Sequence, residues 1–467
     1  MSGYDVLLNP QRVTLGPAPC AVDLGDGSER GEYVNQDYIL RTLGRPHRSI
    51  NLMYCYWPKD EGWPRRASEV FPPSEAFVWS YPYDDYFPYQ GGPGGNPDGE
   101  PFRQIRDIRR HGQEVTLTLT IDCSLEDYYL KAIAEELKPF GRLRLRLNHE
   151  CDGDWFTCNK RFDRRQISAF FCRFHEIIKA TAPEIQTICC FGTIDEATGR
   201  LRYEDDLVPM LRYADIWSVD KYLSLHYAWP FNICERDQLN KGYSYAGVEG
   251  VWREIHRIYD IFVERSGQEK PFEICEFNAD GDVAGQRQQA RELREFYERV
   301  RTEKPPFLKG ITYYQFRDRG RLGLEREDPN NPGVGIATPF LADYRAIIRD
   351  AYFLPHEDWR PLGPGESPTL AWRSAGDADG LGWEVILRGR PSFFELRLEK
   401  DANLMVQVDR VWYYKKPGVE WVDATDAVDR LDRGARVRIV IFAPPADGTL
   451  TPVGTLSPPV LRVRYES

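Results

Sequence analysis

The sequence has no long uninterrupted apolar segment: no apolar run approaches the roughly 20 residues that a membrane-spanning helix requires. Its start, Met-Ser-Gly-Tyr-Asp, lacks the charged stretch followed by an apolar one that marks a secretory signal. These absences predict no membrane partner. They also favour a cytoplasmic location, or secretion if a signal has been trimmed from the chain.

Positive charge is scarce as well. The 61 Lys and Arg residues are outnumbered by 72 Asp and Glu residues, which gives a formal net charge of −11. Nucleic-acid binding is dominated by Lys and Arg that neutralise phosphates, so we expect no nucleic-acid partner. An uncharged or cationic ligand suits this composition better.

Cysteines are present, but not in the pattern of a disulfide framework. The last of the ten is Cys275, and several fall inside predicted buried strands. Cys151 and Cys158 could form a bridge or bind a metal, but no second Cys or His pair has the spacing of a zinc finger. We therefore expect no metal site and no cofactor.

Strands and helices alternate along the first 350 residues, and no glycine-rich phosphate loop follows the first predicted strand, as a doubly wound sheet would typically have. This alternation predicts a (β/α)₈ TIM barrel over residues 1–355. A linker rich in Pro and Gly is expected at 356–369, and short alternating runs predict a small C-terminal β-sandwich at 370–467. The predicted barrel strands are 20–25, 49–57, 114–122, 142–148, 185–191, 215–222, 271–277 and 310–316.

Aromatic residues make up 13% of the chain, and they supply flat apolar faces with polar edges, which suit sugars. Many of them lie in the long segment 58–99, which exceeds an ordinary connection in a compact domain. We expect part of this segment, 77–89, to wall a cleft and to stack on sugar rings. Trp79 in this segment and Trp57 at the end of the second strand are predicted substrate contacts.

Active-site residues of such barrels lie at the C-terminal ends of the strands. The fourth predicted strand ends Arg146-Leu147-Asn148-His149-Glu150. Alternation places Leu147 against the helices, and Arg146, Asn148 and Glu150 on the other face. Glu150 is thus expected to face the barrel mouth.

The seventh predicted strand contains two glutamates, Glu273 and Glu276. They are three residues apart, so alternation places them on opposite faces, with Phe272 and Ile274 on the side of Glu276. Glu276 lies at the mouth end and is the better candidate. Glu273 is expected on the helix-facing side, where a buried carboxylate needs a partner that the sequence does not identify.

Paired carboxylates from two strands are what glycosidic cleavage requires. One protonates the leaving oxygen and the other attacks the anomeric carbon; a retaining enzyme holds them about 5 to 5.5 Å apart. The alternative is that each glutamate only forms an ion pair, for instance with Arg144 or Arg146.

The segment Arg146-Leu147-Asn148-His149-Glu150-Cys151-Asp152-Gly153-Asp154-Trp155 resembles the acid/base signature of glycoside hydrolase family 26. In that family, whose members are retaining TIM-barrel glycosidases of clan A, an Arg lies four residues before the Glu of a His-Glu pair, and Gly and Trp follow. The segments 215–222, 270–277 and 310–316 resemble its sixth, nucleophile and eighth strands in the same order. The resemblance covers roughly residues 20–350.

The resemblance implies a role for each matching residue. Glu150 would be the general acid/base and Glu276 the nucleophile. Tyr222 would hydrogen-bond Glu276, and Arg146 would support both carboxylates. The further substrate-binding residues expected around them are Asn148, His149, Trp155, Tyr314 and Gln315.

The chain also departs from the family pattern. Cys151-Asp152 stand where Met-Asn is usual, and Tyr314-Gln315 where a Trp is expected. These departures surround the sugar subsites, so the family's usual substrate, β-mannan, does not carry over. Asp152 and Asp154 could raise the pKa of Glu150 by like-charge repulsion, bind substrate hydroxyls or a calcium ion, or be solvated loop carboxylates.

The leading hypothesis is an endo-acting retaining glycoside hydrolase of a polysaccharide or oligosaccharide, similar to β-mannanases, β-glucanases or xylanases. One alternative is a non-catalytic carbohydrate-binding protein on a degenerate barrel, with the sandwich as its main binding module. Another is a transglycosylase that shares the covalent intermediate. The sandwich could also simply brace the barrel.

Overall fold

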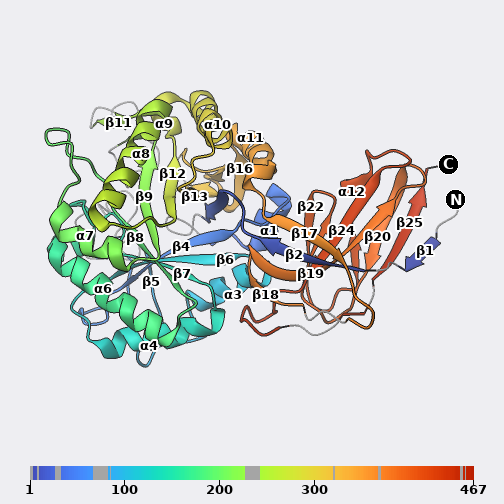
Figure 1. The fold of residues 1–467 in the computed structure, drawn as a ribbon, viewed down its shortest axis with the longest axis horizontal. Helices are drawn as coiled ribbons and strands as arrows, with labels where there is room; N and C mark the ends of the chain where they lie inside the picture. Colours follow the sequence, from blue (N-terminus) through green and yellow to red (C-terminus); the bar gives the residue numbers. More distant parts are fainter. Residues whose placement is uncertain are drawn as a thin grey trace.

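The computed structural model describes residues 4–7, 10–26, 33–66, 83–84, 86–226, 242–318, 321–366, 370–452, 456–457 and 459–466. Eight parallel strands close into a barrel, because the first of them pairs with both the second and the eighth (Figure 1). The predicted (β/α)₈ TIM barrel is therefore confirmed. Its strands are β3 (Ala21–Gly25), β4 (Ser49–Tyr56), β6 (Glu114–Ile121), β7 (Arg144–Leu147), β8 (Gln186–Cys190), β9 (Ile216–Tyr222), β12 (Phe272–Asn278) and β13 (Leu308–Tyr313).

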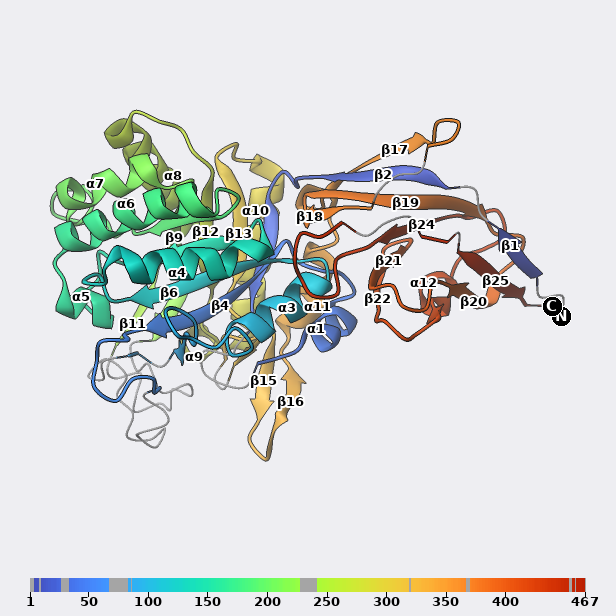
Figure 2. The same cartoon turned by 90° about the horizontal axis from the view of Figure 1, so that it is seen from below.

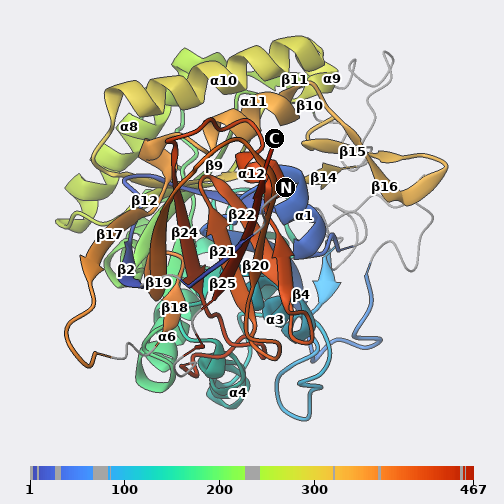
Figure 3. The same ribbon diagram turned by 90° about the vertical axis from the view of Figure 1, so that its right-hand side faces the viewer.

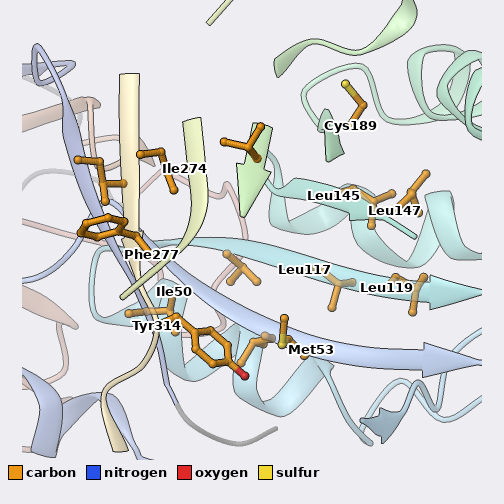
Figure 4. Close-up of a cluster of buried hydrophobic side chains, with 14 of the residues drawn as sticks. Ile50, Met53, Leu117, Leu119, Leu145, Leu147, Cys189, Ile274, Phe277 and Tyr314 are labelled. Carbon is orange, nitrogen blue, oxygen red and sulfur yellow. The ribbon is translucent and has the colours of Figure 1, made fainter. Parts of the chain in front are cut away.

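Helices cover the outside of the barrel. Alternation decides which side chains they meet: Leu145 and Leu147 of β7 join Leu117 and Leu119 of β6 in the apolar layer beneath the helices (Figure 4). Each such fully buried side chain stabilises the fold by about 1.5–3 kcal/mol. The helices are α1 (Gln36–Leu43), α3 (Phe102–Arg110), α4 (Asp127–Leu137), α6 (Arg164–Thr181), α7 (Glu204–Tyr213), α8 (Gly247–Ser266), α10 (Gln286–Glu303) and α11 (Phe340–Ile347).

Short helices and strands lie in the loops that follow the barrel strands. They lie at the C-terminal ends of the strands, which form the mouth of the barrel. These elements are β5 (Phe87–Pro88), α5 (Thr157–Arg161), β10 (Ser224–His226), β11 (Tyr243–Tyr245), α9 (Gly281–Ala284), β14 (Arg317–Asp318), β15 (Glu325–Asp328) and β16 (Asn331–Ala337).

Two antiparallel sheets form the second domain, as predicted. Side chains of both sheets meet in one core, with Trp383, Val406 and Ile439 from the larger sheet and Phe394 and Leu461 from the smaller. The larger sheet contains β17 (His356–Pro361), β2 (Gln11–Gly16), β19 (Asp377–Ile386), β24 (Arg436–Phe442), β21 (Leu404–Val408), β22 (Val411–Lys415) and β18 (Trp372–Ser374); the smaller contains β1 (Tyr4–Leu7), β25 (Val460–Tyr465), β20 (Pro391–Arg397) and β23 (Trp421–Asp423).

The division along the sequence differs from the predicted one. Strands β1 and β2 lie in the predicted barrel segment 1–355, yet they pair with strands of the sandwich. Strand β17 lies within the predicted linker 356–369 and forms an edge of the larger sheet next to β2. The chain therefore begins in the sandwich, crosses to the barrel and returns.

In the described part of the chain, the sandwich packs on loops that lead into barrel strands (Figure 2). The Trp412 amide donates to the Gly44 carbonyl at 3.0 Å, before β4, and the Asn403 amide donates to the Arg110 carbonyl at 2.9 Å, before β6. These loops belong to the N-terminal end of the barrel, opposite the mouth. Among the described residues, no helix combines the length and the apolar character needed to cross a membrane.

Candidate active site

Arg146 organises the inside of the barrel near its mouth. Its Nη2 donates to Oε1 of Glu276 at 2.6 Å, and its Nη1 donates to both carboxylate oxygens of Asp220 at 2.8 and 2.9 Å. Its Nε donates to the Thr118 hydroxyl at 2.8 Å. The guanidinium is fully buried, so it positions two carboxylates from β9 and β12 through charge-assisted bonds.

Glu276 receives a second hydrogen bond from the opposite side. The Tyr222 hydroxyl donates to its Oε2 at 2.7 Å, and Nε2 of His149 lies 3.7 Å from its Oε1. The two donors hold the carboxyl group of Glu276 in one orientation. Burial, followed by the charges of Glu276 and Asp220, raises the pKa of Tyr222 well above its usual value, so Tyr222 stays a donor.

A β-bulge in β12 brings both of its glutamates into the barrel interior. The pairing of β12 with β9 shifts between Ile274 and Glu276, so one residue more is used on β12 than on β9. The predicted placement of Glu273 on the helix-facing side is therefore wrong, as is that of Phe272 and Ile274 beside Glu276, since both pack in the apolar layer.

Glu273 also has the partners that the sequence did not identify. It forms ion pairs with Arg144 and, at 3.1 Å, with Arg48. Burial would raise the pKa of this carboxyl, but the two guanidiniums outweigh it and lower the pKa to about 2. Of the two glutamates on β12, Glu273 is thus an ion-paired carboxylate one layer below the mouth.

Glu150 follows β7 after a local break in the strand. The strand ends at Leu147, and Asn148 and Glu150 have positive φ values of 42° and 49°, so simple alternation does not place them. The indole Nε1 of Trp155 donates to Oε2 of Glu150 at 2.6 Å. Burial, then the neighbouring carboxylates Asp220 and Glu276, raise the pKa of Glu150 well above its usual value.

The surroundings of Glu150 therefore favour its protonated form. The Trp155 bond acts in the opposite direction, because a donor stabilises the charged carboxylate, but it is the weaker influence. Burial also raises the pKa of Asp220, to about 7. The Arg146 charge is the next largest influence and opposes the rise, the carboxylate of Glu276 adds to it, and Cys190 and Lys221 oppose it more weakly. The site thus combines carboxyl groups of different protonation behaviour.

Aromatic rings line this group of carboxyls. His149 packs against Phe156 with ring centroids 4.5 Å apart, and its Nε2 lies 3.3 Å from the Tyr86 hydroxyl. Burial, followed by the Arg146 charge, lowers the pKa of His149 well below its usual value, so the ring is neutral. On the other side, Tyr314 meets Tyr222 edge-on at 6.2 Å.

Three predicted substrate contacts have other roles in the structure. Asn148 is buried, with its amide oxygen accepting from the Ile121 amide at 2.7 Å, and it joins the ends of two strands. Trp57 is 0% exposed beneath Arg161 and Phe162, which leaves no face for a sugar, so that prediction is wrong. Gln315 is buried, 3.4 Å from Asp318. Trp79, with residues 77–82 of the predicted cleft wall, lies outside the described residues.

The two aspartates that follow Glu150 hold loops in place. Asp152 is buried and accepts from the amides of Gly192 and Thr193 at 3.0 and 2.6 Å. Asp154 is exposed and pairs with Arg164 and Arg202. Of the predicted effects, Asp152 does contribute to the raised pKa of Glu150, after the larger influences of burial, Asp220 and Glu276.

Two groups of side chains in the described part of the chain have the spacing of metal ligands. His149, Asp220 and Glu276 form the first, but Arg146 already forms ion pairs with both carboxylates. His226, Asp280 and Asp282 form the second, in which Asp280 accepts from His226, and Arg321 binds Asp282 at 2.6 Å. Both groups are thus engaged in internal ion pairs and hydrogen bonds.

Asp220 and Thr118 were not predicted as site residues. Asp220 is two residues before Tyr222, so alternation along β9 puts both on the inner face, and this signal could have identified it. Thr118 lies on β6 beside Arg146 in the pairing of β6 with β7. A lone threonine in a buried strand offers no such signal.

No family model and no curated protein matches the chain. Similar solved structures include a family 26 β-mannanase from Bacteroides ovatus, at 12% identity over 71% of this chain and 89% of that chain, with a TM-score of 0.42. A family 51 α-L-arabinofuranosidase from Bifidobacterium longum is 9% identical, over 99% of this chain and 98% of that chain, with a TM-score of 0.42. A family 39 glycoside hydrolase from Bacteroides cellulosilyticus is 13% identical, over 91% of this chain and 81% of that chain, with a TM-score of 0.45. Family 26 is thus one of several glycoside hydrolase families represented.

Proposed function

We propose that this chain is a retaining glycoside hydrolase that cleaves a polysaccharide or oligosaccharide by double displacement. The observation that carries the proposal is the contrast between two carboxyl groups of one buried site. Glu276 accepts from Arg146 on one oxygen and from Tyr222 on the other, while burial and like charges keep the pKa of Glu150 high. Fixed donors suit a nucleophile, and a raised pKa suits a proton donor.

In the first step, Glu276 attacks the anomeric carbon and the bond to the leaving oxygen breaks. The proton of Glu150 passes to that oxygen, and a glycosyl ester forms on Glu276. In the second step, Glu150, now ionised, accepts a proton from water, the resulting hydroxyl attacks the anomeric carbon, and Glu276 is released. Arg146 and Tyr222 would guide the attacking carboxylate and support it again when it leaves.

The decisive experiment compares Glu276→Ala with the exposed control Glu196→Gln on mannan, mixed-linkage glucan, xylan and rarer glycans, read by released reducing ends. The control should match the wild type, and Glu276→Ala should have no measurable turnover. Sustained hydrolysis by that variant would refute the nucleophile assignment. NMR of the first product should show retention at the anomeric carbon, and inversion would refute the double displacement.

A further inference from the structure

A pocket of about 520 Å³ lies at the start of α10, beside α9 and the segment that leads into β15. Figure 3 shows α9, α10 and β15 in the upper half of the view. This volume falls within the range of small-ligand sites. Four arginines line the pocket: Arg287 and Arg291 from α10, and Arg321 and Arg326 from the segment around β15. No acidic residue is among its described lining residues.

This concentration of positive charge is unexpected in a chain with a net charge of −11. Arg287 and Arg291 are four residues apart on one helix face, where like charges repel each other. Arg287 also lies in the first turn of α10, which contains no acidic residue and carries the positive end of the helix dipole. The free protein therefore bears repulsion that a bound anion would relieve.

Most of these guanidiniums are available to a ligand. Arg321 is committed to Asp282, at 2.6 Å. Arg287 and Arg291 are exposed, and within the described part of the chain neither they nor Arg326 form a side-chain ion pair or hydrogen bond. The Nε of Arg326 is buried without a hydrogen-bond partner.

The helix itself adds donors at the same place. Gly285 precedes α10 with a φ of 82° and provides no side-chain cap. Its carbonyl accepts from the amides of Gln288 and Gln289, so the amides of Gln286 and Arg287 are the ones that a side-chain cap would otherwise serve. A Cβ at Gly285 would meet nothing within 4 Å, so this end of the helix is open. Backbone amides and guanidiniums that converge on one cavity suit a carboxylate or sulfate group.

The pocket is close to the candidate active site. Gly281, which lines it, is five residues beyond Glu276, so their Cα atoms are at most about 18 Å apart even in a fully extended chain. Both lie at the mouth of the barrel. This distance is comparable to the length of an oligosaccharide of a few units.

We propose that this arginine pocket binds a carboxylate or sulfate group of an acidic glycan, so that the substrate class of the enzyme is anionic. The inference rests on the proposed hydrolase function, which it makes more specific. It also revises the expectation of an uncharged or cationic ligand, because the local charge of the pocket is opposite to that of the whole chain. The two anionic groups share the chemistry that guanidiniums recognise.

The test measures binding to the full chain carrying Glu150→Gln, which slows turnover, by calorimetry with three probes: polygalacturonate oligosaccharides, sulfated carrageenan oligosaccharides and neutral manno-oligosaccharides. We expect at least one acidic probe to bind at least tenfold more tightly than the neutral one. Arg287→Gln with Arg291→Gln should remove that preference, whereas Arg253→Gln, an exposed arginine of α8 outside the pocket, should preserve it. The acidic probe that binds identifies the group as carboxylate or sulfate.

Equal affinity for neutral and acidic probes, or an acidic preference that survives the double substitution, would overturn the inference. Salt gives a second readout, since raising it from about 0.01 to 1 M shortens the Debye length from roughly 30 to 3 Å and should abolish the preference. If Glu276→Ala remains active while the preference depends on the arginines, the hydrolase mechanism fails and the pocket stands. If the enzyme hydrolyses a neutral glycan and the double substitution does not change that rate, the pocket proposal fails and the hydrolase mechanism stands.

Discussion

The indole Nε1 of Trp155 donates a 2.6 Å hydrogen bond to Oε2 of Glu150, a carboxyl whose pKa is raised by burial and by Asp220 and Glu276. The bond favours the ionised form, whereas the other influences favour the protonated form. A residue that alternates between acid and base needs access to both forms. Trp155 thus limits how far the neighbouring charges move the titration of Glu150.

Trp155→Phe keeps an aromatic ring and removes the donor. Without it the pKa of Glu150 rises further, so the fall of kcat/KM at high pH should move to higher pH. Because the carboxyl group of Glu150 remains, kcat/KM at neutral pH should fall by less than about tenfold. A net hydrogen-bond free energy of about 1 kcal/mol corresponds to a change of that size. Trp63→Phe, in a half-buried aromatic cluster with Tyr56 and Tyr83, is the matched control. An unchanged or acid-shifted limb would contradict the role given to Trp155.

Glu150→Gln should lower kcat/KM by about 10² to 10⁴, the usual contribution of general acid/base catalysis. The wild type should lose activity as pH rises through the raised pKa, because the proton donor is then ionised. The variant should lack this alkaline limb, and aryl glycosides, whose leaving groups need no proton, should suffer least in the first step. An alkaline limb that persists in Glu150→Gln would assign the proton donor to another group.

The sequence predicted the barrel well because its signals are local. Leu145 and Leu147 alternate with Arg144 and Arg146, and the structure places the leucines under the helices and the arginines inside. Strand β2 was missed because its partners β17 and β19 lie more than 330 residues further along the chain. The alternation of Val13 and Leu15 within six residues does not reveal such distant partners. Within the sandwich, Asp409 has a φ of 53° and lies in the turn between β21 and β22.

The candidate site was predicted less completely, for reasons of register. The sequence located the end of β12. The bulge in this strand depends on how β12 pairs with β9, and no residue of β12 predicts the bulge. Glu273 therefore shares the interior with Glu276, contrary to strict alternation. Trp57 directly follows the end of β4, and its burial depends on Arg161 and Phe162 of a later segment. The arginine pocket combines residues 287, 291, 321 and 326, which are dispersed in sequence.

Glu273 should contribute to stability in a pH-dependent way. Arg144 and Arg48 lower its folded-state pKa from 4.5 to about 2, so its contribution is complete above pH about 4.5 and is lost as pH falls towards 2. The shift corresponds to stability on the order of 3 kcal/mol. Glu273→Gln should therefore be less stable at pH 7 and should lose less stability than the wild type between pH 5 and 2, as measured by urea unfolding.

The exposed Glu196→Gln provides the control for this experiment and should reproduce the wild-type pH dependence. In Glu273→Gln, the positive charges of Arg144 and Arg48 also lose one of the carboxylates that pair with them. Breaking a buried ion pair typically costs about 3–5 kcal/mol. Equal slopes of stability against pH for Glu273→Gln and the wild type would show that this carboxyl has the same pKa in both states.

Asn403 tests whether the sandwich braces the barrel without taking part in the site. Its amide donates to the carbonyls of Arg110 and Pro444 at 2.9 and 2.7 Å, and its oxygen accepts from the Tyr414 hydroxyl at 2.8 Å. Asn403→Ala leaves these buried groups without their partner and should lower the free energy of unfolding by about 2 kcal/mol. Because the contact lies at the N-terminal end of the barrel, kcat/KM well below Tm should stay within about twofold of the wild type, about 0.4 kcal/mol. A large loss of activity at full folding would instead couple the sandwich to the mouth.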